Sequence, residues 1–337
     1  MRASKRLCKK TALLFLIIII FGIMTSISMP SGAATSKPEI KNEDINNKIL
    51  LASEWLFNQQ RSDGSWPMVT QDKKSSVVAT GLFSLVTYKI ISEYDKSDTK
   101  KYEIDIEKVI SFLLSHQHDE GYWEATSSFP WNKTEVTTAA LFGLVSVDYK
   151  GRALEKGMCW LLNQQKINGS WNDDCWDTSW AIYLFSYSDY PHSDRIIKTA
   201  CQWLANNQRE DGSWKTNLSN LKRFEPLWTT PPSIFALAQT GQYHNAMSKG
   251  LKYLEKKQNK NGSFGHWDAS KTGLALMAFS SLSEYPELMN DYILSSEKSV
   301  QWFIKNQRRK GTWPGGFHPF NIVDTAFSIW GLTHFIK

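Results

Sequence analysis

The sequence predicts an all-α fold, a single (α/α)6 toroid of six helical hairpins with an inner and an outer ring of helices, over residues 46–337. One aromatic-containing phrase recurs six times along the chain, and each copy is followed by a more apolar segment. A helix that is apolar all round must be buried on every side. Alternating polar-faced and apolar helices therefore indicate two concentric rings.

The repeated phrase joins the end of an amphipathic helix to a tight turn. Each copy has a Gln, a Gly four residues later and an aromatic residue two residues after that, as in Gln165, Gly169 and Trp171. We expect the glycine to take a positive φ that reverses the chain, and the aromatic ring to fold back as a plug. The Gln amide is expected to bond carbonyls freed at the helix end. The six glycines are Gly64, Gly121, Gly169, Gly212, Gly262 and Gly311.

A second, more apolar helix is expected about ten residues after each turn. The fourth copy carries Pro231 and Pro232, which a first helical turn tolerates. No strands of consequence and no second domain are expected. The six copies span residues 78–85, 137–144, 178–185, 230–237, 272–279 and 325–332.

The N-terminal residues 1–34 are predicted to be a secretory signal peptide. Cations in the first ten residues precede the apolar run 12–24, and the small residues 31–34 are typical of a cleavage site. This run is short for a membrane span of ~20 residues, although an uncleaved anchor is the alternative. Residues 35–45 would then be a leader, and the protein is expected to be secreted or held at the cell surface.

Charge and cysteine content exclude some classes of protein. The formal net charge is +6, but five cations lie in the predicted signal and no Lys/Arg stripe elsewhere indicates a nucleic-acid partner. Three cysteines remain after cleavage, Cys159, Cys175 and Cys201, and an odd number over this length is no disulfide framework. A single bridge from Cys159 to Cys201 stays open.

The phrase Gln-x-x-x-Gly-Ser-Trp resembles the QW motif of squalene–hopene and oxidosqualene cyclases, and related repeats occur in protein prenyltransferase β subunits. The resemblance covers residues 46–337 and is specific for the fold. It implies a central cavity and a reaction started by a carboxylic acid, with no metal or cofactor. The same toroid also occurs in cobalamin carriers, complement thioester domains and carbohydrate-active enzymes, so the fold alone does not imply the function.

The cyclases carry an Asp-x-Asp-Asp-Thr-Ala motif at the start of an inner helix, and its central Asp is the acid. Two inner-helix starts here keep the tail of that motif, at Asp177 and Asp324, but the position of the acid holds Trp176 and Val323. The equivalent position in the second repeat is Glu135. The intact motif is absent, and the resemblance makes Glu135, Asp177 and Asp324 the candidate catalytic residues.

Each candidate acid also has a structural interpretation. Asp177 and Asp324 stand where a helix N-cap is expected, and capping favours the charged carboxylate. A catalytic acid instead needs a pKa raised by apolar burial or by a second carboxylate. Glu135 lies near Phe129 and Trp131 and is not obviously a cap, so it is the better acid, with a solvated loop position as the alternative.

Another group of aromatic residues lies at the inner-helix starts or in the loops before them. Their rings could stabilise a carbocation, stack on sugar rings or close the toroid. The tryptophans of the repeated phrase are instead interpreted as structural plugs. The candidate substrate-binding residues are Trp131, Trp176, Trp228, Trp267 and Phe317.

The prenyltransferase resemblance raises the question of a zinc site. Asp173-x-Cys175 matches two of that family's zinc ligands, but a zinc site needs a third protein ligand and the next inner-helix start offers no His. We therefore expect neither a metal nor a cofactor.

The leading functional prediction is an exported terpene-cyclase-like protein that binds or cyclises an apolar polyprenyl or triterpene-type ligand. The partner would be an apolar small molecule or a lipid, and peripheral membrane contact is one option. The alternatives are a non-catalytic extracellular binding module and a carbohydrate lyase or hydrolase, so whether the chain is an enzyme stays open. An aromatic chamber with a buried acid favours cyclisation, an open groove with several carboxylates favours sugars, and a filled core favours a scaffold.

Overall fold

The computed structural model describes residues 40–93, 106–127, 130–188, 190–191, 193–216, 226–315 and 321–333. The predicted signal at 1–34, residues 35–39 of the predicted leader and Phe317 lie outside the described residues. The first described helix begins at Asn42, earlier than expected, with Glu43 and Asp44 in its first turn, where acidic side chains are favourable. Within the described ranges, no helix is long and apolar enough to cross a membrane.

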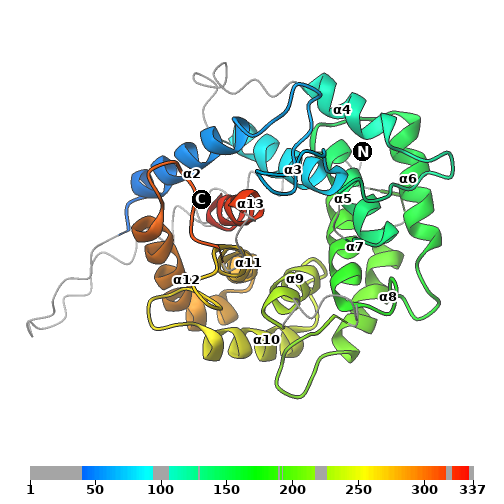
Figure 1. Ribbon diagram of the computed structural model, residues 1–337. Coiled ribbons are helices and arrows are strands. Elements are labelled where there is room, and N and C mark those ends of the chain that lie inside the picture. Colours follow the sequence, from blue (N-terminus) through cyan, green and yellow to red (C-terminus); the bar gives the residue numbers. More distant parts are fainter. Residues whose placement is uncertain are drawn as a thin grey trace, which may run out of the picture. The chain divides into compact units, whose positions relative to one another are not determined.

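Twelve α-helices alternate between two rings in the described part of the chain, as Figure 1 shows. The outer ring contains α2 (Asn42–Phe57), α4 (Ile106–Ser115), α6 (Arg152–Asn163), α8 (Ser193–Asn206), α10 (His244–Lys257) and α12 (Pro286–Asn306). The inner ring contains α3 (Val77–Glu93), α5 (Lys133–Ser146), α7 (Cys175–Tyr187), α9 (Pro226–Ala238), α11 (Ala269–Ser280) and α13 (Asn321–Thr333). A short 3-10 helix, η2 (Ser281–Glu284), follows α11, and the described residues contain isolated bridges but no strand. The predicted all-α toroid is confirmed.

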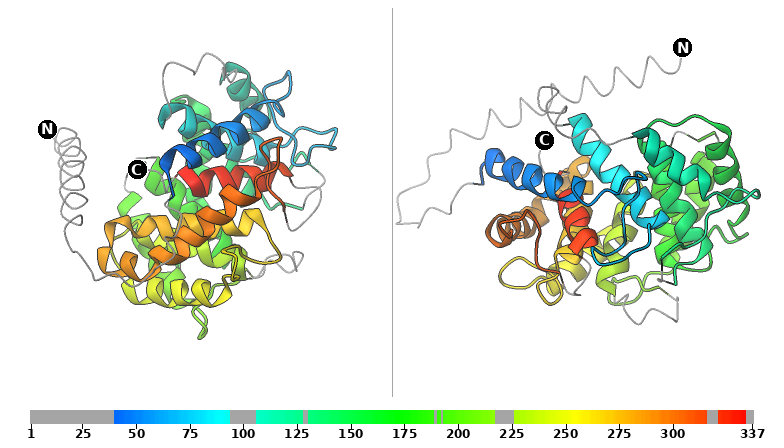
Figure 2. Two further views of the ribbon diagram at one scale, coloured as in Figure 1. Left: turned by 90° about the vertical axis from the view of Figure 1, so that its left-hand side faces the viewer. Right: turned by 45° about the horizontal axis from the view of Figure 1, so that its top comes forward.

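Burial differs between the two rings in the predicted way. In the outer helix α6 the buried residues Gly157, Met158 and Leu161 lie on one face, whereas nearly every residue of the inner helix α5 is buried. The ring closes because α13 contacts both α2 and α3, and the turned views in Figure 2 show outer and inner helices side by side. One detail differs from expectation: α9 begins at Pro226, so Pro231 and Pro232 lie in its second turn rather than its first.

The aromatic plugs hold each outer helix to the turn that follows it. The indole N–H of Trp171, which is fully buried, donates to the Leu161 carbonyl of α6 at 2.7 Å, and four other repeat tryptophans bond in the same way. The expected bond to a freed carbonyl of the same helix end is made by Gln59, whose side chain donates to the Trp55 carbonyl at 3.2 Å. The Gln that follows it in the phrase has a different role, because it bonds the turn glycine. Gln307 donates to the Gly311 carbonyl at 3.1 Å and to the Lys48 carbonyl of α2 at 2.7 Å. The last repeat is thereby joined to the first.

The turns also position the inner helices. In the third repeat the backbone N–H of Trp171 donates to the hydroxyl of Thr178, in the first turn of α7, at 3.0 Å. Four other repeats contain the same bond, to Thr80, Thr137, Thr230 and Thr272. Because the bond recurs, the Thr of each of these inner helices is held at the same height relative to its turn, and residues at the same distance from the Thr lie at one level of the ring.

Candidate active site

A chamber lies inside the inner ring, and the residue two positions before each inner-helix Thr contributes to its wall. This level of the ring combines one carboxylate, one hydroxyl and two indoles with two apolar side chains. In chain order these residues are Val78, Glu135, Trp176, Trp228, Ser270 and Val323, and all six line the chamber.

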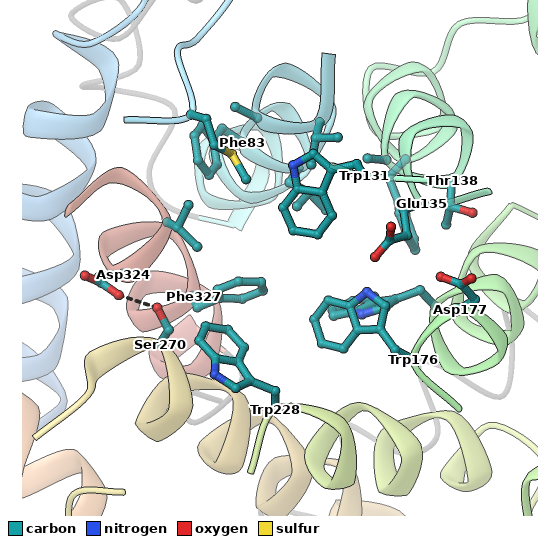
Figure 3. Close-up of a pocket in the computed structure, with 18 of the residues that line it drawn as sticks. Phe83, Trp131, Glu135, Thr138, Trp176, Asp177, Trp228, Ser270, Asp324 and Phe327 are labelled. Atoms are coloured by element: carbon teal, nitrogen blue, oxygen red, sulfur yellow. Dashed lines mark hydrogen bonds between the residues drawn. The ribbon is translucent and has the colours of Figure 1, made fainter. Parts of the chain in front are cut away.

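Aromatic side chains form a large part of the chamber wall. The chamber encloses roughly 1110 Å³ of space not occupied by protein atoms, its open side included. Figure 3 shows indole and phenyl rings facing this space from several inner helices, with carboxylates between them. Ligand sites are usually concave and apolar with a few placed polar groups, and this chamber has that character. The aromatic lining residues are Phe83, Trp131, Phe142, Trp176, Trp180, Trp228 and Phe327.

Glu135 of α5 and Asp177 of α7 are two neighbouring buried acids that share a hydrogen-bond donor residue. Asn132 joins them: its backbone N–H donates to Glu135 Oε2 at 2.8 Å, and its side-chain amide donates to Asp177 Oδ2 at 3.0 Å. Asn172 donates a second amide hydrogen bond to the same Asp177 oxygen at 2.7 Å. Both carboxylates are at least nine-tenths buried, and both line the chamber.

The two oxygens of Glu135 have different surroundings. Oε2 accepts the Asn132 N–H, so a proton on this carboxyl group belongs on Oε1. Oε1 is buried and accepts no well-formed hydrogen bond, and an interaction of the carboxyl group with the Trp176 side chain lowers the Glu135 pKa. Figure 3 shows the Glu135 carboxyl group directed toward the aromatic rings.

Burial raises the pKa of Glu135 well above its usual value, and the nearby Asp177 carboxylate raises it further. Burial also raises the pKa of Asp177, with a second contribution from Asp174. The amides of Asn172 and Asn132 oppose that rise because they stabilise the charged form. Asp177 is therefore the member of the pair better suited to hold the negative charge, and Glu135 the one better suited to hold the proton.

The third candidate acid, Asp324, lies apart from the first two. In Figure 3 it is across the chamber from Glu135 and Asp177, beside α11, and accepts a hydrogen bond from the Ser270 hydroxyl. Burial raises the pKa of Asp324 to about 8, and the Ser270 hydroxyl acts in the opposite direction. Asp324 therefore belongs to a second buried polar group on the chamber wall, separate from the Glu135–Asp177 pair.

Two sequence interpretations of the helix starts are wrong. Glu135 is part of a cap: the Asn132 side chain accepts the backbone N–H of Glu135 at 2.9 Å while Glu135 accepts that of Asn132, which is a capping box. The pattern Asn132-x-x-Glu135 carried that signal. Asp177 is not the N-cap of α7, because Asp174 takes that position and Asp177 is the third helical residue. Asp324 also lies inside its helix, three residues after the first residue of α13.

The predicted aromatic residues divide between the chamber wall and the surface. Trp131, Trp176 and Trp228 line the chamber, whereas Trp267 does not. Trp267 has a left-handed backbone (φ 57°) in the turn before α11, which leaves its side chain 54% exposed. Sequence reasoning missed Trp180 and Phe327, although each follows a chamber-lining residue, Trp176 and Val323, by four positions and so shares its helix face.

The remaining polar clusters do not make a second candidate centre. Over the described residues, no group of three or more His, Cys, Asp or Glu side chains could hold a metal ion. Asp173 pairs with Lys166 and bonds Asn168 in its own turn. Cys159 is exposed and Cys201 is buried, and both are free thiols.

The sequence also matches a family model, the prenyltransferase α-α toroid domain, over residues 53–335. The chain belongs to the prenyltransferase α-α toroid family. No curated protein matches the chain significantly.

Several solved structures share this toroid at low sequence identity. The type II terpene cyclase MstE from Scytonema, in its apo form, is 14% identical with a TM-score of 0.66, covering 87% of this chain and 98% of its own. A possible member of the GH105 family from Klebsiella pneumoniae is 13% identical with a TM-score of 0.59, covering 92% of this chain and 99% of its own. The ent-copalyl diphosphate synthase from Streptomyces platensis is 15% identical with a TM-score of 0.55, covering 77% of this chain and 50% of its own. At these identities the likeness shows the fold alone.

The buried acids of this toroid give a testable pH dependence of stability. Asp324 has a pKa of about 8 in the folded protein against 3.8 ordinarily, so between these values the folded state keeps a proton that the unfolded state has lost. The free energy of unfolding should therefore fall as pH rises from about 4 to about 8. Asp324→Asn should make this fall shallower by up to about 1.4 kcal/mol per pH unit, measured by urea unfolding. Parallel stability profiles for parent and variant would contradict a buried, protonated Asp324.

Proposed function

We propose that this protein is an acid-initiated terpene cyclase that takes a neutral polyprenyl-type ligand into the chamber. The observation that carries the proposal is the buried Glu135 carboxyl group, whose Oε1 faces an aromatic chamber while its other oxygen is occupied by the Asn132 N–H. A carboxylic acid with a raised pKa beside a charged partner is the arrangement that general acid catalysis needs. Glu135 also occupies the position of the central Asp of the cyclase motif, counted from Thr137.

In this reaction Glu135 protonates a terminal alkene. The O–H bond at Oε1 breaks, the alkene π electrons form the new C–H bond, and a tertiary carbocation results. The next alkene attacks that cation and closes a ring. The final cation loses a proton to a base, so the product is an isomer of the substrate and the acid can be restored.

Two features of the chamber support this chemistry. The faces of Trp131, Trp176, Trp180 and Trp228 can stabilise positive charge as it moves along the chain. Asp177, with two amide donors on one oxygen, can remain charged and electrostatically offset the cation. The apolar walls exclude water, which would otherwise trap the cation as an alcohol.

The charge on the walls indicates a neutral ligand rather than a diphosphate. The described residues that line the chamber include four acids, Glu135, Asp177, Asp268 and Asp324, and no Lys, Arg or His. The Lys271 ammonium group is buried beside the Asp268 carboxylate at 3.5 Å. A diphosphate in this space would lie near the Asp177 carboxylate, with no lining cation to offset its own charge. A variant of the Scytonema cyclase is seen with a prenylated ligand that carries no diphosphate, geranylgeranyl dihydroxybenzoate, as its substrate.

A product assay tests the proposal. The purified protein would be incubated separately with squalene, geranylgeraniol and geranylgeranyl diphosphate, and extracts analysed by gas chromatography and mass spectrometry, after dephosphorylation for the last. We expect a cyclic isomer of unchanged mass from a neutral substrate and none from the diphosphate. Product from the diphosphate alone would reject the neutral-ligand argument. If the protein binds all three compounds but forms no cyclic isomer of any of them, it is a binding protein and not an enzyme.

A further inference from the structure

The axis of the inner ring is filled with aromatic side chains just beyond the chamber. Trp180 and Tyr183 of α7 contact Trp330 of α13, with ring centroids 5.5 and 5.8 Å apart. These two helices face each other across the inner ring in Figure 1. A contact between them therefore spans the axis and closes it at this level.

Rings from two other inner helices complete this layer. Phe235 of α9 lies 4.7 Å from Tyr183, and Phe142 of α5 lies 5.3 Å from it, both measured between centroids. Tyr183, Phe235 and Trp330 are buried and do not line the chamber, whereas Trp180 does. We call Trp180, Tyr183, Phe235 and Trp330 the aromatic floor. Trp180 is its chamber-facing member.

We propose that Trp180 sets the length of the apolar chain that the chamber accepts. This inference rests on the proposed function only in taking an apolar chain as the ligand. A chain with one end near Glu135 and Asp177 extends along the helices toward Trp180, three residues further along α7 than Asp177. There it meets the indole, with Tyr183 and Trp330 packed behind.

The surroundings of Trp180 make it replaceable. Its indole Nε1 has no hydrogen-bond partner among the described residues, so shortening the side chain breaks no hydrogen bond. The side chain is only 7% exposed, so its removal adds space directly continuous with the chamber. Apolar cavities of this kind stay available to apolar ligands rather than filling with water.

Straight-chain 1-alkanols of increasing length provide a direct measurement of the chamber, by isothermal titration calorimetry. Each added methylene that is buried should raise affinity about fourfold. We expect affinity to rise with chain length in the parent protein and then to level off at the length where the chain reaches Trp180. In Trp180→Ala the levelling should move to longer alkanols. The longest alkanols should then bind about fifteenfold more tightly than to the parent, the value of two further buried methylenes.

Leu82→Ala is the matched control, because Leu82 lines the chamber but is not part of the floor. It should change affinities without moving the levelling length. If Trp180→Ala does not fold, as judged by its melting curve, Trp180→Phe should move the levelling length by a smaller amount. An unchanged levelling length in a folded Trp180 variant, or no alkanol binding in the parent, overturns the proposal. The two proposals can fail separately. If Trp180 variants move the length at which alkanol affinity levels off but no cyclic product forms, the cyclase chemistry is rejected and the role of Trp180 in setting chain length stands.

Discussion

Glu135→Gln should lower the rate of cyclic product formation by about 10³-fold, within the range that a positioned general acid contributes. Gln keeps the size of Glu and can still accept the Asn132 N–H through its carbonyl oxygen, so the capping box loses little. It has no acidic proton for an alkene. The measurement is single-turnover product formation at saturating substrate, with ligand affinity determined in parallel. We expect affinity to change little, because the substitution alters neither the shape nor the aromatic walls of the chamber.

Asp177→Asn separates the acid from its charged neighbour. The Asn oxygen can still accept the amide hydrogen bonds of Asn132 and Asn172, but the negative charge beside Glu135 is lost. Because that charge raises the pKa of Glu135, its removal should shift the loss of activity, as pH rises, to lower pH.

One outcome for each variant would contradict this assignment of roles. Full activity in Glu135→Gln would show that another group supplies the proton. A pH profile unchanged by Asp177→Asn would show that the two acids act independently.

The fold could be predicted from the sequence because its main determinants are local and repeated. The turn, its glycine and its aromatic plug occur within seven residues, as from Gln165 to Trp171, and six copies average out the irregularities of any one. The bonds from the Gln amides to a neighbouring outer helix could not be predicted from sequence. Their second acceptor lies on the next outer helix, so Gln307 bonds Lys48 across nearly the whole length of the chain.

The candidate site could be predicted only in part from the sequence, because it is formed by residues from different repeats that share a level of the ring. The sequence predicts that Glu135 lies two residues before Thr137, and that Trp176 and Trp228 occupy the equivalent position in their own repeats. The hydrogen bonds from Asn132 and Asn172 to Asp177 were not, because they join separate turns. Trp267 is exposed and has a left-handed backbone, and the spacing of the repeats does not predict that conformation.

Gly169→Ala should destabilise the protein by about 3 kcal/mol. Gly169 has a φ of 94°, where an L-residue is strained by roughly 1–2 kcal/mol. A Cβ at this position would also lie 2.5 Å from the Thr199 carbonyl oxygen of α8, closer than such atoms can approach. Relieving that overlap needs a shift of α8 against the turn, which costs roughly a further 1–3 kcal/mol. All six repeat glycines have a positive φ, as the sequence predicts.

Gly241→Ala is the matched control, because it isolates the backbone strain from the close approach. Gly241 also has a positive φ, 67°, but the nearest atom to its added Cβ is the Tyr285 hydroxyl at 4.0 Å. It should therefore cost only about 1–2 kcal/mol. Urea unfolding of the two variants at one pH gives both values. The excess loss in Gly169→Ala measures how closely each turn packs on the next outer helix, and equal losses would show that this packing contributes nothing beyond the turn itself.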